Sequence, residues 1–246
     1  FLWWFSTGIL LLMVRRADRQ GHTAHTRNVV LTVPVAALGL AMVITSLGVA
    51  TPGGHMRAFL GALALWGWIE LAFLSGVITG PKLAPCPEGA TTGQRFAAAW
   101  DALAHHELLL LGGLAVLVGL TTGAENTTAV WTYGILFAAR ISAKLNIFFG
   151  VPRINFEFIP DTLDALKSHF CKGPVTAMFA FSITGLTLAV GCFAYHALTA
   201  VDPGAVTRFT LLTTLAVLAL VEHWLMVVPL PDAKLCRWML PAPNPS

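Results

Sequence analysis

Ionisable side chains interrupt four long apolar stretches of this sequence. The stretch WGWIELAFLSG contains one acid, and LAHHELLLL contains three consecutive ionisable residues. Two cations stand four residues apart in ARISAKLN, and an acid precedes an imidazole in LVEHWLMVV. The complete set is Glu70, His105, His106, Glu107, Arg140, Lys144, Glu222 and His223. An ionisable residue in a membrane-spanning helix costs about 2.5–3.5 kcal/mol on insertion scales, so each of these residues needs a partner or a function.

Three kinds of chemistry fit this set. Ion pairs and hydrogen bonds between acids and cations would fix the order of the helices. A metal ion could be held by carboxylates and imidazoles, and the candidate ligands are Glu70, His106, Glu107, Glu222 and His223. The neutral imidazoles of His106 and His223 could instead bind the magnesium of a chlorin pigment, because Ala102 and Ala219 leave room one turn before them. The Glu-x-x-His spacing of di-iron bundles is absent from the sequence.

The composition excludes most soluble classes of protein. Of 246 residues, 56% are hydrophobic and 11% are charged, whereas soluble chains carry about 25% charged residues. An intrinsically disordered chain, a disulfide-stapled secreted domain and a nucleic-acid-binding protein are therefore excluded. The sequence predicts a polytopic membrane protein in contact with the lipid bilayer.

The apolar stretches predict an all-α membrane helix bundle that forms a single domain over 1–246. A spanning helix needs about 20 apolar residues. Complete spans are predicted near 29–50, 58–80, 102–121, 127–150, 175–198 and 206–228. The apolar stretch at 1–14 is shorter, and we interpret it as a span whose beginning is missing. The prediction is about seven transmembrane helices with one short helix on the cytoplasmic surface.

The cations predict the orientation of these spans. Eleven Lys and Arg residues fall in alternate loops and the C-terminal tail, whereas only Arg57 and Arg208 fall on the other side. Because cytoplasmic loops are enriched in Lys and Arg, the N-terminus is predicted to be extracytoplasmic and the C-terminus cytoplasmic. The eight ionisable residues would then share the cytoplasmic half of the bilayer. We predict a polar cluster there, in which Arg140 and Lys144 face some of the acids.

The segment at 160–170 is predicted to be a short amphipathic helix on the cytoplasmic membrane surface. Pro160 suits the first turn, acids follow it, and cations stand near the end. Leu163, Leu166 and Phe170 share one face at helical spacing, and they are the predicted contacts for a partner.

Several segments together resemble one known family. They are FLWWFSTG (1–8), WGWIELAFLSGVITGP (66–81), the HHEL segment from His105, RISAKLNIFFGVPRINFEFIPDTLDALKSHF (140–170) and EHWLMVVPLPDAKLCRW (222–238). The chain is similar over nearly its whole length to the PuhE family, whose members act in the assembly of photosynthetic complexes in purple-type bacteria. The most specific part of this resemblance is the segment SAKLN, which is followed by GVP and by Asn155-x-Glu157. Arg153 and His169 depart from the residues usual in the family at their positions.

The resemblance implies a role in building the photosynthetic reaction centre and its light-harvesting antenna, with an influence on bacteriochlorophyll supply. It supplies no catalytic residues. The first hypothesis is therefore a non-catalytic assembly factor of the bacterial inner (intracytoplasmic) membrane, which binds reaction-centre or light-harvesting polypeptides or pigment. The alternative is a membrane metalloenzyme that acts on a pigment or quinone through the Glu/His set. A transporter is a third possibility, but the internal repeats and broken helices typical of transporters are not evident.

Overall fold

The computed structural model describes residues 2–229, except for the side chains of residues 2–7, 22 and 158. Over these residues the regular structure is helical, apart from one isolated bridge between Val151 and Lys172. The elements are α1 (Leu2–Asp18), α2 (His22–Leu31), α3 (Val33–Ile44), α4 (Pro52–Leu74), α5 (Thr92–Thr121), α6 (Thr128–Phe149), η1 (Phe156–Phe158), η2 (Asp161–His169), α7 (Ala177–Thr199) and α8 (Pro203–Leu225). The all-α prediction is confirmed for this part of the chain.

Five helical stretches are long and apolar enough to cross a membrane. They are Thr23–Ile44, which joins α2 and α3, and Pro52–Leu74, Thr92–Thr121, Ala177–Thr199 and Pro203–Leu225. Neither α1, with 17 residues, nor α6, which carries Arg140 and Lys144, is among the five. Five of the predicted spans are thus supported by length and composition, and the arrangement with seven spans stays a prediction.

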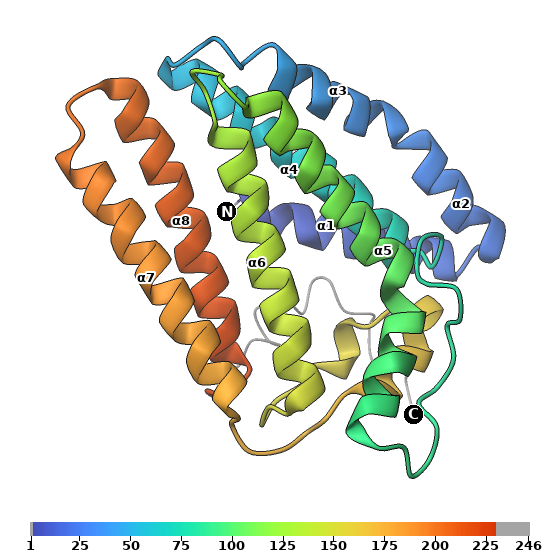
Figure 1. Cartoon of the computed structure of the whole chain (residues 1–246). Helices are drawn as coiled ribbons and strands as arrows, with labels where there is room; N and C mark the ends of the chain where they lie inside the picture. Colours follow the sequence, from blue (N-terminus) through green and yellow to red (C-terminus); the bar gives the residue numbers. More distant parts are fainter. Residues whose placement is uncertain (1, 230–246) are drawn as a thin grey trace.

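The long helices alternate in direction (Figure 1). The short connections 45–51, 122–127 and 200–202 lie at one end of the bundle. The longer connections 75–91 and 150–176 lie at the opposite end, together with η1 and η2. In the same view α1 runs across the bundle, at a steep angle to the long helices. The buried Val14 of α1 packs with Leu71 and Ala72 of α4, so α1 is attached to the bundle by its C-terminal half.

Side-chain caps fix where three of the long helices begin. The Thr51 hydroxyl accepts a hydrogen bond from the backbone of Gly54, and Asp202 caps α8 in the same way. Thr91 and Gln94 form a reciprocal capping box at the start of α5. Each cap satisfies an N–H group that has no partner within its helix.

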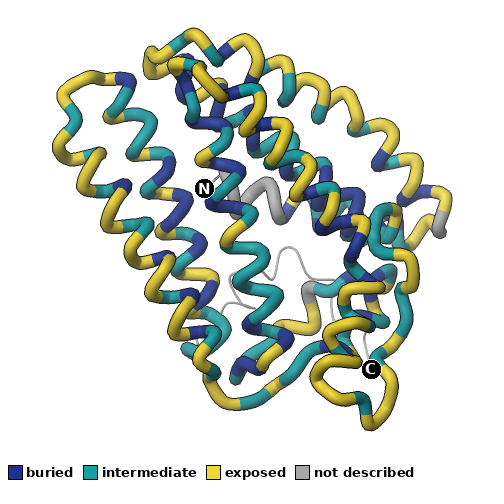
Figure 2. Tube along the Cα trace, in the orientation of Figure 1, coloured by how far each residue is buried: buried dark blue, intermediate teal, exposed yellow. Residues whose placement is uncertain are grey.

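Helix α4 is the centre of the bundle. Inside its apolar window 56% of the residues are buried, against 17–28% in the other four candidate spans. Figure 2 shows the buried residues lining the inside of the bundle, while the outer faces of α3, α5 and α7 are exposed. These outward faces are apolar, and they include Leu38, Leu111 and Leu188. An apolar exterior around a well-packed centre is what a bilayer requires of a helix bundle.

Two glycines allow α3 and α4 to touch along their backbones. A Cβ atom on Gly39 would lie 2.8 Å from the carbonyl oxygen of Gly61, and a Cβ atom on Gly61 would lie 2.6 Å from the carbonyl oxygen of Gly39. Any side chain at either position would push the helices apart. Small residues at such crossings are the usual means of close helix packing in membranes.

The segment predicted as a surface helix packs against the bundle. It forms the 3-10 helix η2, which is kinked at Leu163. Leu163 is 2% exposed and Leu166 is 6% exposed, and both pack in one cluster with Phe73 and Ala102. In this structure the apolar face that carries Leu163 and Leu166 is covered by α4 and α5, and a contact of these residues with a partner stays a prediction. Phe170 is half-buried and packs against the same cluster.

Candidate functional site

Three central helices bring five of the eight predicted residues into one polar cluster. Glu70 comes from α4, His106 and Glu107 from α5, and Arg140 and Lys144 from α6. Arg140 donates from Nη2 to Glu70 Oε2 at 2.7 Å. Lys144 donates from Nζ to Glu107 Oε1 and to His106 Nδ1, the latter at 3.2 Å. Two carboxylates therefore face two cations, and the formal charges of the four groups cancel.

His106 is the enclosed centre of this cluster. Its side chain is fully buried, and its ring stacks on Phe73 with 4.1 Å between ring centroids and 26° between the planes. His106 Nδ1 lies 3.2 Å from Lys144 Nζ and 3.4 Å from Glu107 Oε1, so a cation and a carboxylate share this edge of the ring. His106 Nε2 faces Glu70 Oε1 at 3.7 Å, which is beyond hydrogen-bond distance.

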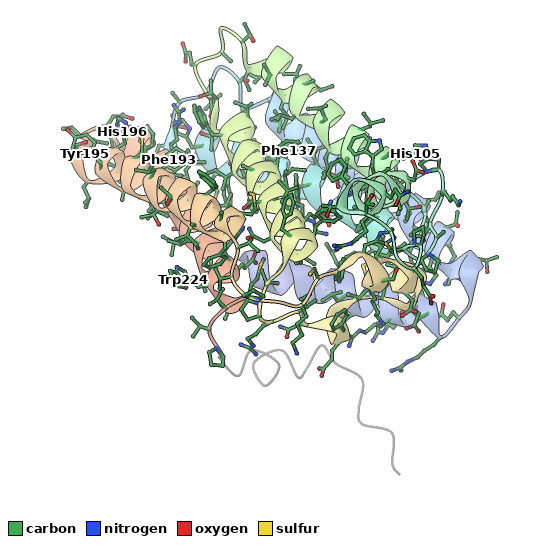
Figure 3. The ribbon with its side chains drawn as sticks, turned by 60° about the horizontal axis from the view of Figure 1, so that its bottom comes forward. His105, Phe137, Phe193, Tyr195, His196 and Trp224 are labelled. Atoms are coloured by element: carbon green, nitrogen blue, oxygen red, sulfur yellow. The ribbon has the colours of Figure 1, made fainter. Side chains whose placement is uncertain are left out.

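The other three predicted residues lie outside the cluster. His223 is buried, its Nδ1 donates to the carbonyl of Ala219 at 2.8 Å, and Ser142 donates to its Nε2 at 2.8 Å. His105 is exposed on α5, on the other side of the molecule from α7 (Figure 3). Glu222 is exposed on α8 and borders a cavity. The cluster is thus smaller than the sequence predicts, because neighbours in a helix point about 100° apart.

A cavity of about 560 Å³ adjoins the cluster. It is bordered by apolar side chains of α1, α3, α4, α6 and α8, among them Leu10, Leu63 and Leu215. Trp66 and Trp68 of α4 also border it. Among the residues that the structure describes, its charged border is formed by Glu70, Arg140 and Glu222. This volume lies within the range of about 300–1,000 Å³ found for small-molecule sites, which are also mostly apolar with a few polar groups.

A family model described as "Protein of unknown function (DUF3623)" matches residues 1–246. The chain belongs to the DUF3623 family. It is 47% identical over 242 residues to a protein of Rhodobacter capsulatus named "Uncharacterized 30.4 kDa protein in puhA 5'region", and the match covers 98% of this chain and 88% of that relative. No solved structure matches the chain.

The predicted metal ligands of this DUF3623 protein that the structure describes do not form one ligand set. Among the described residues, no three His, Cys, Asp or Glu side chains are grouped so that they could hold a metal ion. Of the predicted ligands, Glu70 and Glu107 are bonded to cations, while Glu222 and His223 lie apart from them on α8. A tetrahedral or octahedral site needs several donors that converge on one point, and these do not.

Neither predicted pigment-binding imidazole offers an open nitrogen to the cavity. His106 Nε2 is enclosed against Glu70, and both ring nitrogens of His223 are hydrogen-bonded. His106 and His223 are also absent from the border of the cavity. The structure as it stands gives the magnesium of a chlorin no axial ligand at these two positions.

Sequence reasoning missed two members of the DUF3623 site. Phe73 covers the ring of His106, and Lys144 Nζ lies 5.4 Å from the centroid of the same Phe73 ring. Ser142 completes the hydrogen bonding of His223. Phe73 stands three residues after Glu70, so helical spacing could have placed it beside the cluster. Ser142 begins the SAKLN segment that carries the family resemblance, but its spacing gives no indication that it bonds to a histidine of α8.

Proposed function

We propose that this DUF3623 protein is a non-catalytic membrane accessory factor for the bacterial photosynthetic reaction centre and light-harvesting complex. The observation that carries the proposal is the relative encoded in the puhA 5' region, a reaction-centre gene region, which is 47% identical over almost the whole chain. The resemblance of several segments to the PuhE family supports the same role. Proteins of such regions commonly serve the complex whose genes surround them, and the proposed partners are its polypeptides and its pigment.

The chemistry of the polar cluster supports a structural rather than a catalytic use. Each carboxylate is bonded to a cation from another helix, and the central imidazole is enclosed. A general base must reach its substrate within about 2.6–3.2 Å, directly or through one water. The two ion pairs instead connect α4 and α5 to α6, and they favour a single arrangement of these three helices.

The proposed location is the bacterial inner (intracytoplasmic) membrane, with the N-terminus extracytoplasmic and the C-terminus cytoplasmic. The cations of the long connections gather at the end that holds η2, which supports this orientation. Single cysteines at Glu88 and Glu125, in a background without native cysteines, test it. A membrane-impermeant thiol reagent added to spheroplasts should label Glu125→Cys and leave Glu88→Cys unlabelled. The reverse pattern would invert the topology.

Affinity purification tests the assembly role. The tagged protein is extracted in mild detergent from native phototrophic membranes, and the recovered polypeptides are identified by mass spectrometry. Reaction-centre or light-harvesting polypeptides should be enriched over a control multi-pass protein that carries the same tag in the same membranes. Deletion of the gene should also lower the near-infrared absorption of assembled complexes. Equal recovery with the control and an unchanged spectrum would refute the role.

A further inference from the structure

The cavity beside the ion pair of Glu70 and Arg140 is elongated along the bundle. Residues of α4 border it from Leu60 to Leu74. At 1.5 Å per residue, these two positions lie about 21 Å apart along the helix axis. The hydrocarbon part of one leaflet is about 15 Å deep, which is half of a bilayer core of about 30 Å. The cavity is therefore long enough for a single hydrocarbon chain that lies parallel to α4.

Small residues keep this path open. Alanines and a glycine border the cavity on three helices, and they are Ala64, Gly67, Ala139, Ala143 and Ala219. A Cβ atom on Gly67 would meet nothing within 4 Å. The lining of an empty apolar space lacks partners for dispersion contacts. A bound hydrocarbon chain supplies these contacts along the whole length of the cavity.

The cavity reaches the outside of the bundle beside α1 and α3. Ile9 of α1 and Val35 of α3 border it, and they are 40% and 50% exposed. Both side chains are apolar, so this opening suits a surface in contact with lipid. A molecule dissolved in the bilayer can enter here from the side, without passing through water.

The two ends of the cavity differ in polarity. Helices α4, α6 and α8 run in the same direction, toward the end of the bundle that holds η2 (Figure 1). Glu70 stands ten residues after Leu60, and Arg140 stands five residues after Ile135, so their ion pair lies toward the η2 end of the cavity. A lipid in the leaflet on that side has the same polarity, with its polar end toward η2 and its chains toward the bilayer centre.

We propose that this cavity binds one acyl chain of a lipid from the leaflet on the η2 side. The chain lies along α4, from the level of the ion pair toward Leu60, and is enclosed by α1, α6 and α8. The contacts of the chain carry the binding, whatever the head group. The site needs only the cavity and its border, so it stands or falls independently of the assembly role.

The chain offers a matched pair of variants for the test. Gly67→Phe fills the cavity without forcing the backbone, because the space around its Cβ position is open. Gly112 of α5 is equally open, but it is exposed and does not border the cavity. Gly112→Phe therefore adds the same side chain to a helix and leaves the site unchanged.

The assay is photo-cross-linking of the purified full chain in detergent micelles. The probe is a phosphatidylcholine with a diazirine in one acyl chain, and the labelled residues are mapped by mass spectrometry. Labelling of the cavity border on α4 and α6 should saturate at one probe per protein, whereas labelling of the outward faces at Leu38 and Leu188 should rise in proportion to the probe. Gly67→Phe should lower the labelling of the cavity about tenfold, and Gly112→Phe should leave it unchanged.

The parent protein alone keeps the test decisive if Gly67→Phe does not fold. Labelling that rises in proportion to the probe at every position would mean that the lipid only surrounds the protein, and it would overturn the proposal. Equal labelling of the cavity border in a folded Gly67→Phe variant would do the same. Displacement of the probe by geranylgeraniol at lower concentration than by unlabelled phosphatidylcholine would also overturn it, because the occupant would then be an isoprenoid chain.

Discussion

Removal of Arg140 is expected to destabilise the protein far more than neutralisation of its partner. The two residues form one ion pair, but their surroundings differ, since the Glu70 side chain is 10% exposed and the Arg140 side chain is 35% exposed. Arg140→Met leaves a buried carboxylate whose Oε1 already has no hydrogen-bond partner. Glu70→Gln leaves a cation that can turn toward the cavity.

The magnitudes follow from this asymmetry. Leaving one charge of a buried pair uncompensated costs about 3–5 kcal/mol, which is the expected loss for Arg140→Met. Glu70→Gln loses only the charge-assisted part of one hydrogen bond, about 1.5 kcal/mol. The double variant Glu70→Gln/Arg140→Met should be more stable than Arg140→Met alone, because a neutral pair of similar volume carries no desolvation cost.

The assay is the free energy of unfolding in mixed micelles titrated with a denaturing detergent, measured for both single variants and the double variant. Lys167→Met is the control, because its partner Asp164 is 69% exposed and an exposed pair contributes at most about 1 kcal/mol. Equal losses for Arg140→Met and Glu70→Gln, or additive losses in the double variant, would refute the pairing as described.

Three further predictions concern packing and capping. Gly61→Ala should lower the free energy of unfolding by about 1–3 kcal/mol in the same titration, since its Cβ would lie 2.6 Å from the carbonyl oxygen of Gly39. Its control is Gly119→Ala, whose Cβ would lie in open space and which should leave the stability unchanged or raise it. Phe73→Ala should lower the free energy of unfolding by about 3–5 kcal/mol, because it removes a ring that is 4% exposed and stacked on the imidazole of His106. A loss below about 1 kcal/mol would contradict this packing. Thr91→Ala should lower the free energy of unfolding by about 0.5–2 kcal/mol and speed the exchange of backbone amide hydrogens only in the first turn of α5. Unchanged exchange in that turn would show that the cap contributes little.

Depth along a span was predictable from the sequence, and it indicated that the acids and the cations would face one another, without assigning the individual pairs. Glu70 and Arg140 each stand ten residues before the end of their predicted spans, 58–80 and 127–150, and these two spans run in the same direction. Opposite charges at one depth lower their desolvation cost by meeting, so the sequence indicated the cluster before any contact was known. The same reasoning placed Lys144 opposite the acids as a group and did not assign it to Glu107.

The direction in which each side chain points could not be predicted. His105 and His106 are neighbours in the sequence, but one is exposed and the other is fully buried. Depth is the same for both, and only the packing of α5 against α4 and α6 separates them. The packing of Leu163 and Leu166 against the bundle could not be predicted for a similar reason. An apolar face at helical spacing suits a membrane surface and a protein surface equally well.

The ion pair between Glu70 of α4 and Arg140 of α6 imposes an order on events during synthesis of the chain. Seventy residues separate Glu70 from Arg140, so at about 5–20 residues per second the acid is synthesised roughly 4–14 s before its counter-ion. During that interval α4 carries a carboxylate that the lipid interior disfavours. The Glu70 carboxylate can therefore gain its counter-ion only after α6 has been synthesised.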